Sequence, residues 1–214
     1  MRLYLTLAML IPVASMVMGM RTNKFVWHAL LTFSCACIVG AAGILARGTA
    51  IIPLLAGLAI SLVGDYFMCH KKDRQWMYIL GIAFFLIAHV CFIVYSVPRF
   101  VGEVRIWVCA AALLLALGWY MQKRVLPNID SMPMRIAVAV YCAVSLISLI
   151  SAAGMDGNRY EAILYAFGIF MIVSSDCMIA ECDFVHSPTW QHYIRPLYAL
   201  CHILVTASAI AGIV

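Results

Sequence analysis

Residues 76–97 read WMYILGIAFFLIAHVCFIVYSV, a run of 22 residues without an Asp, Glu, Lys or Arg. At 1.5 Å per residue, a helix of this length crosses a hydrocarbon core about 30 Å thick. Backbone groups inside lipid must be satisfied within their own segment, so such a run is helical. Similar runs fill the chain and predict eight spanning helices: Leu3–Met20, Phe25–Leu45, Thr49–Cys69, Trp76–Val97, Val101–Met121, Pro133–Ala153, Tyr160–Glu181 and Tyr193–Ile213.

The composition agrees with a membrane protein. The chain is 66% hydrophobic and 11% charged, with a mean hydropathy of +1.03, and a soluble fold could not bury that much apolar surface. Connections are short, so residues 1–214 are expected to form a single all-α transmembrane domain. The first run lacks a small-x-small cleavage site, and we expect it to be retained as a helix. No basic domain with interleaved aromatic residues indicates nucleic acid, which leaves membrane lipids as partners.

The positive charges predict the orientation. The connections after the first, third, fifth and seventh helices hold nine cations: Arg21, Lys24, Lys71, Lys72, Arg74, Lys123, Arg124, Arg135 and Arg195. The opposite side holds five: Arg2, Arg47, Arg99, Arg105 and Arg159. By the positive-inside rule both termini face away from the cytosol. We expect a multi-pass protein of a bacterial inner (plasma) membrane.

Two of the predicted helices carry an aspartate, and the helix that follows each of them carries a histidine. Asp65 in the third helix is followed 24 residues later by His89, and Asp176 in the seventh is followed 26 residues later by His202. An ionisable side chain in lipid costs a few kcal/mol, so it normally faces the bundle interior and serves a function. The matched pairs predict one internal polar site and two parallel repeats of four helices.

Further polar residues accompany these four. Ser61 shares a helical face with Asp65, Tyr198 shares one with His202, Ser175 adjoins Asp176, and Tyr141 adds a phenol from the sixth helix. Four residues of the last loop are of types that bind metals: Cys182, Asp183, His186 and His192. Their spacing matches no zinc pattern, and no C-x-x-C occurs among the nine cysteines. No metal and no cofactor are expected.

Five segments carry a resemblance to a known family: ISLVGDYFM, GIAFFLIAHVCFIVY, IAVAVYCAVSLISL, FGIFMIVSSDCMIA and YALCHILVTAS. In this order they resemble the YhhN family of integral membrane proteins, and Gly64–Asp65, Ala88–His89 and Ser175–Asp176 are the specific part. The resemblance implies lysoplasmalogenase activity, which is hydrolysis of the vinyl ether bond of a lysophospholipid. The family commonly has glutamine where this chain has His202, so that position can serve to hold a hydrogen bond.

The implied chemistry suits the residues. Vinyl ether hydrolysis needs a general acid, a negative group facing an oxocarbenium ion and a base for water, much as glycoside hydrolysis does. Asp65 and Asp176 are the predicted catalytic residues, and the sequence leaves open which is the acid. The expected substrate-binding residues are Ser61, His89, Tyr141, Ser175, Tyr198 and His202.

Two other functions fit the same residues. A zinc-dependent lipid hydrolase, similar to a ceramidase, could use Asp65, Asp176, His89 and His202 as ligands. A small transporter is also compatible with internal repeats and midplane ionisable residues. Paired helices interrupted by Gly or Pro, which form transporter sites, are not evident in the sequence.

Overall fold

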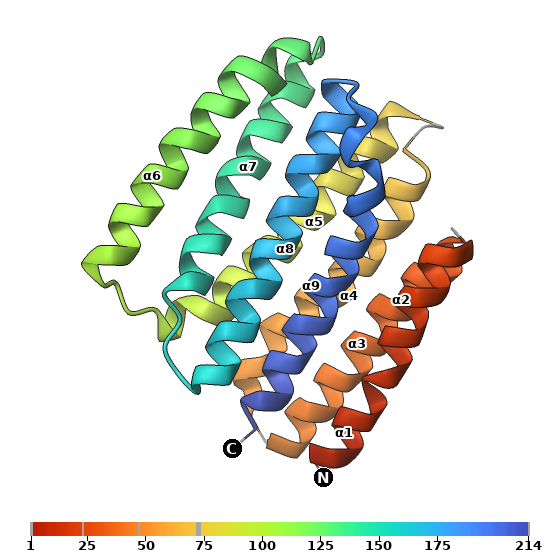
Figure 1. The fold of residues 1–214 in the computed structure, drawn as a ribbon, viewed down its shortest axis with the longest axis vertical. Helices are drawn as coiled ribbons and strands as arrows, with labels where there is room; N and C mark the ends of the chain where they lie inside the picture. Colours follow the sequence, from red (N-terminus) through yellow and green to blue (C-terminus); the bar gives the residue numbers. More distant parts are fainter. Residues whose placement is uncertain (1, 23, 47, 72–73, 214) are drawn as a thin grey trace.

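The computed structural model describes residues 2–22, 24–46, 48–71 and 74–213. Arg47 and Lys72 of the predicted charge pattern lie outside these residues. Figure 1 shows long helices running side by side. The helices are α1 (Arg2–Ala8), α2 (Leu10–Thr22), α3 (Phe25–Ala46), α4 (Ile52–Cys69), α5 (Gln75–Ser96), α6 (Val104–Tyr120), α7 (Met132–Ala153), α8 (Arg159–Phe184) and α9 (Gln191–Ala211). Short 3₁₀ turns and one π turn, Met121–Val125, join or extend them.

The described residues contain eight helical segments long and apolar enough to cross a membrane, as predicted, and they form no strand. Here α1 and α2 together make the first span. The protein is therefore an integral, multi-pass membrane protein. Figure 1 shows both termini at one end of the bundle, opposite the α8–α9 connection, as an even number of spans requires.

The largest differences from the predicted bounds lie in the fifth span, Val104–Asn128, and the eighth span, Pro188–Ala211. The fifth span begins at Val104, because Phe100 bridges to Met155 and the Val101 amide donates to the Gly154 carbonyl at 2.8 Å. These backbone bonds hold the residues before α6 extended. The eighth span begins at Pro188, because a 3₁₀ turn runs directly into α9. Hydrophobicity encodes neither the backbone bridge before α6 nor the 3₁₀ turn before α9.

The helices pack as two matched halves. In the first half α3 lies against α4, and it also contacts α9 of the second half. In the second half α7 lies against α8, and it also contacts α5 of the first half. Close approach within each half also recurs at matched places. A Cβ at Gly57 of α4 would lie 2.6 Å from the Phe92 ring, and one at Gly168 of α8 would lie 2.8 Å from the Val205 side chain. Two parallel four-helix repeats would give matched contacts of this kind, and the repeat itself stays a prediction.

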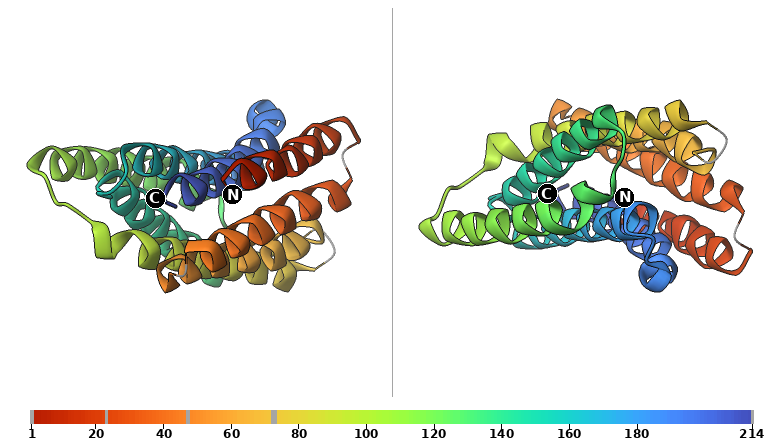
Figure 2. Two further views of the ribbon diagram at one scale, coloured as in Figure 1. Left: turned by 90° about the horizontal axis from the view of Figure 1, so that it is seen from below. Right: turned by 90° about the horizontal axis from the view of Figure 1, so that it is seen from above.

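Helix α6 lies at the edge of the molecule. Figure 2 shows α6 and α7 at one side of the bundle and α2 and α3 at the other. Ala110 is the buried residue within α6, whereas the main core forms among α3, α4, α5, α8 and α9. The central helices therefore carry the candidate site.

Helix α8 is fastened at both ends by the same arrangement. Near its start, Glu161 accepts hydrogen bonds from Tyr95 at 2.8 Å and from Arg99 at 2.5 Å. Near its end, Glu181 accepts from Tyr120 at 2.7 Å and from Arg124 at 2.8 Å. In each case a Tyr-x-x-x-Arg pair from a neighbouring helix meets one carboxylate. These contacts fix the position of the helix that carries Asp176.

Candidate functional site

Asp176 lies at the centre of a polar cluster built by three helices. Tyr141 of α7 donates a hydrogen bond to Asp176 Oδ2 at 2.7 Å. His89 of α5 places Nε2 3.4 Å from the same oxygen. The His89 and Tyr141 rings meet edge to face, with centroids 5.5 Å apart. The two aromatic side chains thus hold one oxygen of the carboxyl group.

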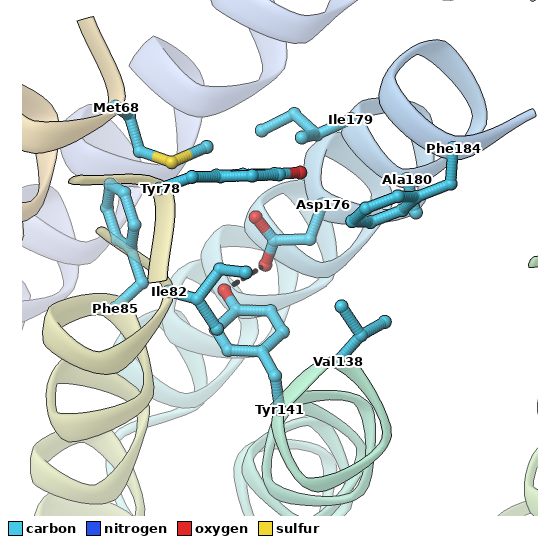
Figure 3. Close-up of a pocket in the computed structure, with 10 residues that line it drawn as sticks. All are labelled: Met68, Tyr78, Ile82, Phe85, Val138, Tyr141, Asp176, Ile179, Ala180 and Phe184. Carbon is cyan, nitrogen blue, oxygen red and sulfur yellow. Dashed lines mark hydrogen bonds between the residues drawn. The ribbon is translucent and has the colours of Figure 1, made fainter. Parts of the chain in front are cut away.

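The other oxygen of Asp176 is free to act on a ligand. No hydrogen bond to Oδ1 occurs within the described chain, and the Asp176 side chain is 17% exposed. It opens into a cavity of about 440 Å³ of empty space, which includes its mouth. The lining is Met68, Tyr78, Ile82, Phe85, Val138, Tyr141, Asp176, Ile179, Ala180 and Phe184 (Figure 3). The carboxyl is thus the charged group of a largely apolar cavity, as ligand sites often have.

A second polar group closes one side of this cavity. The Tyr78 hydroxyl donates to Asp183 Oδ2 at 2.8 Å, Lys71 pairs with the same carboxylate, and the Lys71 ammonium lies 5.2 Å from the Tyr78 ring centroid. In Figure 3 the Tyr78 ring lies across the cavity from Tyr141, with Met68 beyond it. Asp183, one of the residues whose type suggested a metal ligand, therefore fixes the Tyr78 side of the cavity.

Asp65 lies in a different cluster. Thr32 of α3 donates to Asp65 Oδ2 at 3.2 Å, and Asp65 is 9% exposed. The Tyr198 hydroxyl lies close to this carboxyl, although it makes no hydrogen bond of standard geometry. Asp65 does not line the cavity. The cluster joins α3, α4 and α9 and is enclosed.

The Phe85 ring lies against both clusters. It lines the Asp176 cavity, contacts the Tyr198 ring edge to face at 5.8 Å, and would lie 3.1 Å from a Cβ at Gly64. The sequence predicted one internal site, whereas the structure forms two adjacent clusters. The described residues contain no group of three or more His, Cys, Asp or Glu side chains placed to hold one metal ion.

Three other predicted site residues, Ser61, Ser175 and His202, form hydrogen bonds to backbone carbonyls inside the bundle. Ser61 donates to the Gly57 carbonyl at 2.9 Å, and Ser175 donates to the Ile194 carbonyl of α9 at 3.1 Å. His202 is fully buried, and its Nδ1 donates to the Tyr198 carbonyl at 3.0 Å. A carbonyl only accepts, so this bond leaves Nε2 as the acceptor nitrogen. None of these three residues lines the cavity.

Of the ten residues that line the cavity, the sequence predicted only Tyr141 and Asp176 as site residues, and Tyr78 and Phe85 are among the eight that it did not predict. Both belong to the apolar run at 76–97, where aromatic residues are unremarkable. Their spacing of seven places both on the Asp176 side of α5 together with Ile82. This face is a helical stripe that could have been found by starting from His89 and stepping back by four, seven and eleven residues.

Comparison with known proteins gives one match. The model of the YhhN family matches residues 23–209, which is most of the chain and includes both clusters. Searches of curated proteins and of solved structures return no significant match.

Proposed function

The chain belongs to the YhhN family, and from this premise we propose that it is a membrane-embedded hydrolase that cleaves the vinyl ether bond of lysoplasmalogens. The family is associated with lysoplasmalogenase activity. The observation that carries the proposal is the Asp176 carboxyl, which has one oxygen held by Tyr141 and the other facing an apolar cavity. Such a cavity suits the vinyl ether end of an alkenyl chain.

In the proposed first step, Asp176 acts as a general acid. It gives its proton to the alkene carbon distal to the ether oxygen, and the π electron pair forms the new C–H bond. The positive charge develops on the carbon bonded to oxygen, beside the newly formed carboxylate. A fixed carboxylate stabilises such an oxocarbenium ion in a site from which water is excluded. Tyr141 and His89 orient the carboxyl throughout.

In the second step the same carboxylate acts as a base. A water oxygen bonds to the cationic carbon and its proton passes to Asp176, which restores the acid. The resulting hemiacetal then loses its hydroxyl proton while the alcohol oxygen gains one and the C–O bond breaks. One vinyl ether and one water become a fatty aldehyde and a glycerophospho-alcohol. One residue can serve as acid and then as base, as the acid/base carboxyl of retaining glycosidases does.

Asp65 then has a supporting part in this scheme. It lies outside the cavity lining, where it ties α3, α4 and α9 through Thr32 and the neighbouring Tyr198. We propose that this cluster keeps Phe85 and the cavity wall in place.

The experiment offers the purified protein three lipids of equal chain length: a lysoplasmalogen, its alkyl-ether analogue and an acyl lysophospholipid. We expect aldehyde from the first alone, because an alkyl ether cannot be protonated to an oxocarbenium ion. Activity should survive EDTA. Aldehyde release that is lost on chelation and restored by zinc would contradict the carboxyl mechanism, and no release with any of the lipids would contradict the function.

A further inference from the structure

Buried polar atoms without a protein partner gather on one interface. Within the described residues, the α5–α7 interface holds three such atoms: His89 Nδ1, Ser145 Oγ and Ser148 Oγ. Buried serines elsewhere in the bundle behave differently, because Ser34 and Ser208 donate to carbonyls of their own helices at 2.9 and 2.8 Å. A buried hydroxyl or imidazole nitrogen without a partner costs free energy, and in native proteins water commonly supplies the missing bond.

These atoms begin at the reacting carboxyl. Tyr141 bonds to Asp176, and the Ser145 hydroxyl, four residues further along α7, lies close to the Tyr141 hydroxyl. Ser148 follows three residues later. His89, which approaches Asp176 through Nε2, turns its unpaired Nδ1 away from that carboxyl. The polar groups thus lead from the back of the cavity into the bundle.

The series continues to the opposite end of the molecule. Ser151 of α7 is bonded to Ser96 of α5 at 2.8 Å. The Ser96 hydroxyl lies close to that of Tyr165, whose ring lies 5.0 Å from Tyr95. Tyr95 bonds to Glu161, which pairs with Arg99. From Asp176 to Glu161 along α8 is 15 residues, or about 22 Å of helix.

The proposed reaction needs a route of this kind. One water is consumed in each turnover, yet the cavity in front of Asp176 is lined mainly by apolar side chains. An alkenyl chain seated there would fill the mouth and exclude water from that side. The polar groups described above lie along α5, α7 and α8, and apart from Tyr141 and Asp176 none of them lines the cavity.

We propose that the α5–α7 interface holds a file of water molecules that runs from the Arg99–Glu161 end to Asp176 and supplies the water for hydrolysis. The supply role rests on the proposed function, whereas the presence of the water does not. His89 Nδ1, Ser145 and Ser148 are the groups that bind this water. Each of them forms one hydrogen bond to a water molecule of the file or to the next polar side chain along it.

The first test detects the water without any substrate. A short X-ray pulse turns bound water into hydroxyl radicals, which oxidise side chains next to it, and mass spectrometry locates the products. Tyr165 is fully buried and is the reporter. We expect it to be modified in the native protein and several-fold less in the Ser145→Val/Ser148→Val variant, whose added methyl groups fill the space beside the hydroxyls. Ser34→Val/Ser208→Val is the matched control and should leave Tyr165 labelling unchanged.

The second test measures turnover of the same variants. With Ser145→Val/Ser148→Val we expect kcat to fall roughly tenfold and KM to fall with it, because slowing the addition of water, which follows protonation, lowers both constants and leaves kcat/KM unchanged. The control pair should keep the native kcat. If the double variant is not monodisperse in detergent, Ser148→Val alone is used in both tests.

The outcomes separate the two proposals. An unlabelled Tyr165 in the native protein, or equal labelling in blocked and control variants, overturns the water file even where vinyl ether is cleaved. If the Ser145→Val/Ser148→Val variant loses Tyr165 labelling but keeps the native kcat, the file exists but does not supply the water for hydrolysis. Normal labelling in a protein that cleaves no vinyl ether would leave the file standing and the proposed function overturned.

Discussion

At the scale of single residues, the two membrane aspartates occupy matched positions but meet different neighbours. Asp176 receives a phenol from α7 and faces a cavity, whereas Asp65 receives a threonine hydroxyl from α3 and is enclosed. Access to a ligand therefore separates two residues that look equivalent in the sequence. The catalytic proposal assigns the proton transfers to the accessible one.

Asp176→Asn should reduce kcat for aldehyde release by about 10²–10⁴-fold, the usual contribution of a general acid–base group. Asparagine keeps the shape and the bond from Tyr141 but cannot exchange the proton. Asp65→Asn can still accept from Thr32 and should lose much less. Both variants are compared by initial rates after size-exclusion chromatography. Equal losses in the two would favour the two-carboxylate mechanism predicted from the sequence.

Tyr141→Phe should lower kcat by roughly ten- to a hundredfold, since a hydrogen bond to a charged group contributes about 1.5–3 kcal/mol. The phenyl ring preserves packing against His89, so the protein should stay folded. Tyr160→Phe, on the exposed surface of α8, is the control and should match the native enzyme. A Tyr141→Phe enzyme with native kcat would show that this bond does not orient the reacting carboxyl.

At the scale of elements, α8 is the helix on which the site depends. Its ends are fastened by Glu161 and Glu181, and its middle approaches α9 closely at Gly168. A helix fixed at three levels cannot slide relative to α5 and α7, which present His89 and Tyr141. Rigid support of this kind keeps a catalytic group within the small distances that proton transfer needs.

Gly168→Ala should destabilise the protein by about 1–3 kcal/mol, the usual cost of adding a methyl group to a filled interface. The new Cβ would lie 2.8 Å from the Val205 side chain and 3.3 Å from the Cys201 carbonyl oxygen, which cannot move freely. Gly118→Ala on α6 is the control, because its Cβ meets nothing within 4 Å. Thermal unfolding in detergent should show a lower Tm for Gly168→Ala only. Equal Tm values would mean that α8 and α9 can separate without cost.

At the scale of the whole molecule, the two halves form equivalent clusters that exchange partners. Asp176 of the second half meets His89 of the first, and Asp65 of the first half lies beside Tyr198 of the second. Neither cluster can form within a single half. The contact between Phe85 and Tyr198, which precede His89 and His202 by four residues each, lies where the halves meet.

The orientation in the membrane gives a prediction at this scale. In spheroplasts, a protease-sensitive tag at the C-terminus should be cleaved by added protease, and a tag inserted at residues 129–131 should be cleaved only after the membrane is permeabilised. The reason is the excess of cations at the end that holds the α8–α9 connection. Each tagged protein is first checked for native aldehyde release. Cleavage in the reverse pattern would contradict the charge argument.

The sequence by itself determined the fold class, because uninterrupted apolar runs of this length can only be spanning helices. Eight spans and the ionisable residues inside the bundle follow from local composition and spacing, and the family follows from the resemblance of five segments. Boundaries such as Val104 and Pro188 did not follow, since backbone contacts between distant loops set them. Helical spacing likewise places Asp65 and Asp176 at a depth and on a face but does not say which helix that face meets. Only the packing of α5, α7 and α8 brought Tyr141 and His89 to Asp176, placed Phe85 against both clusters and left one of the aspartates open to a cavity.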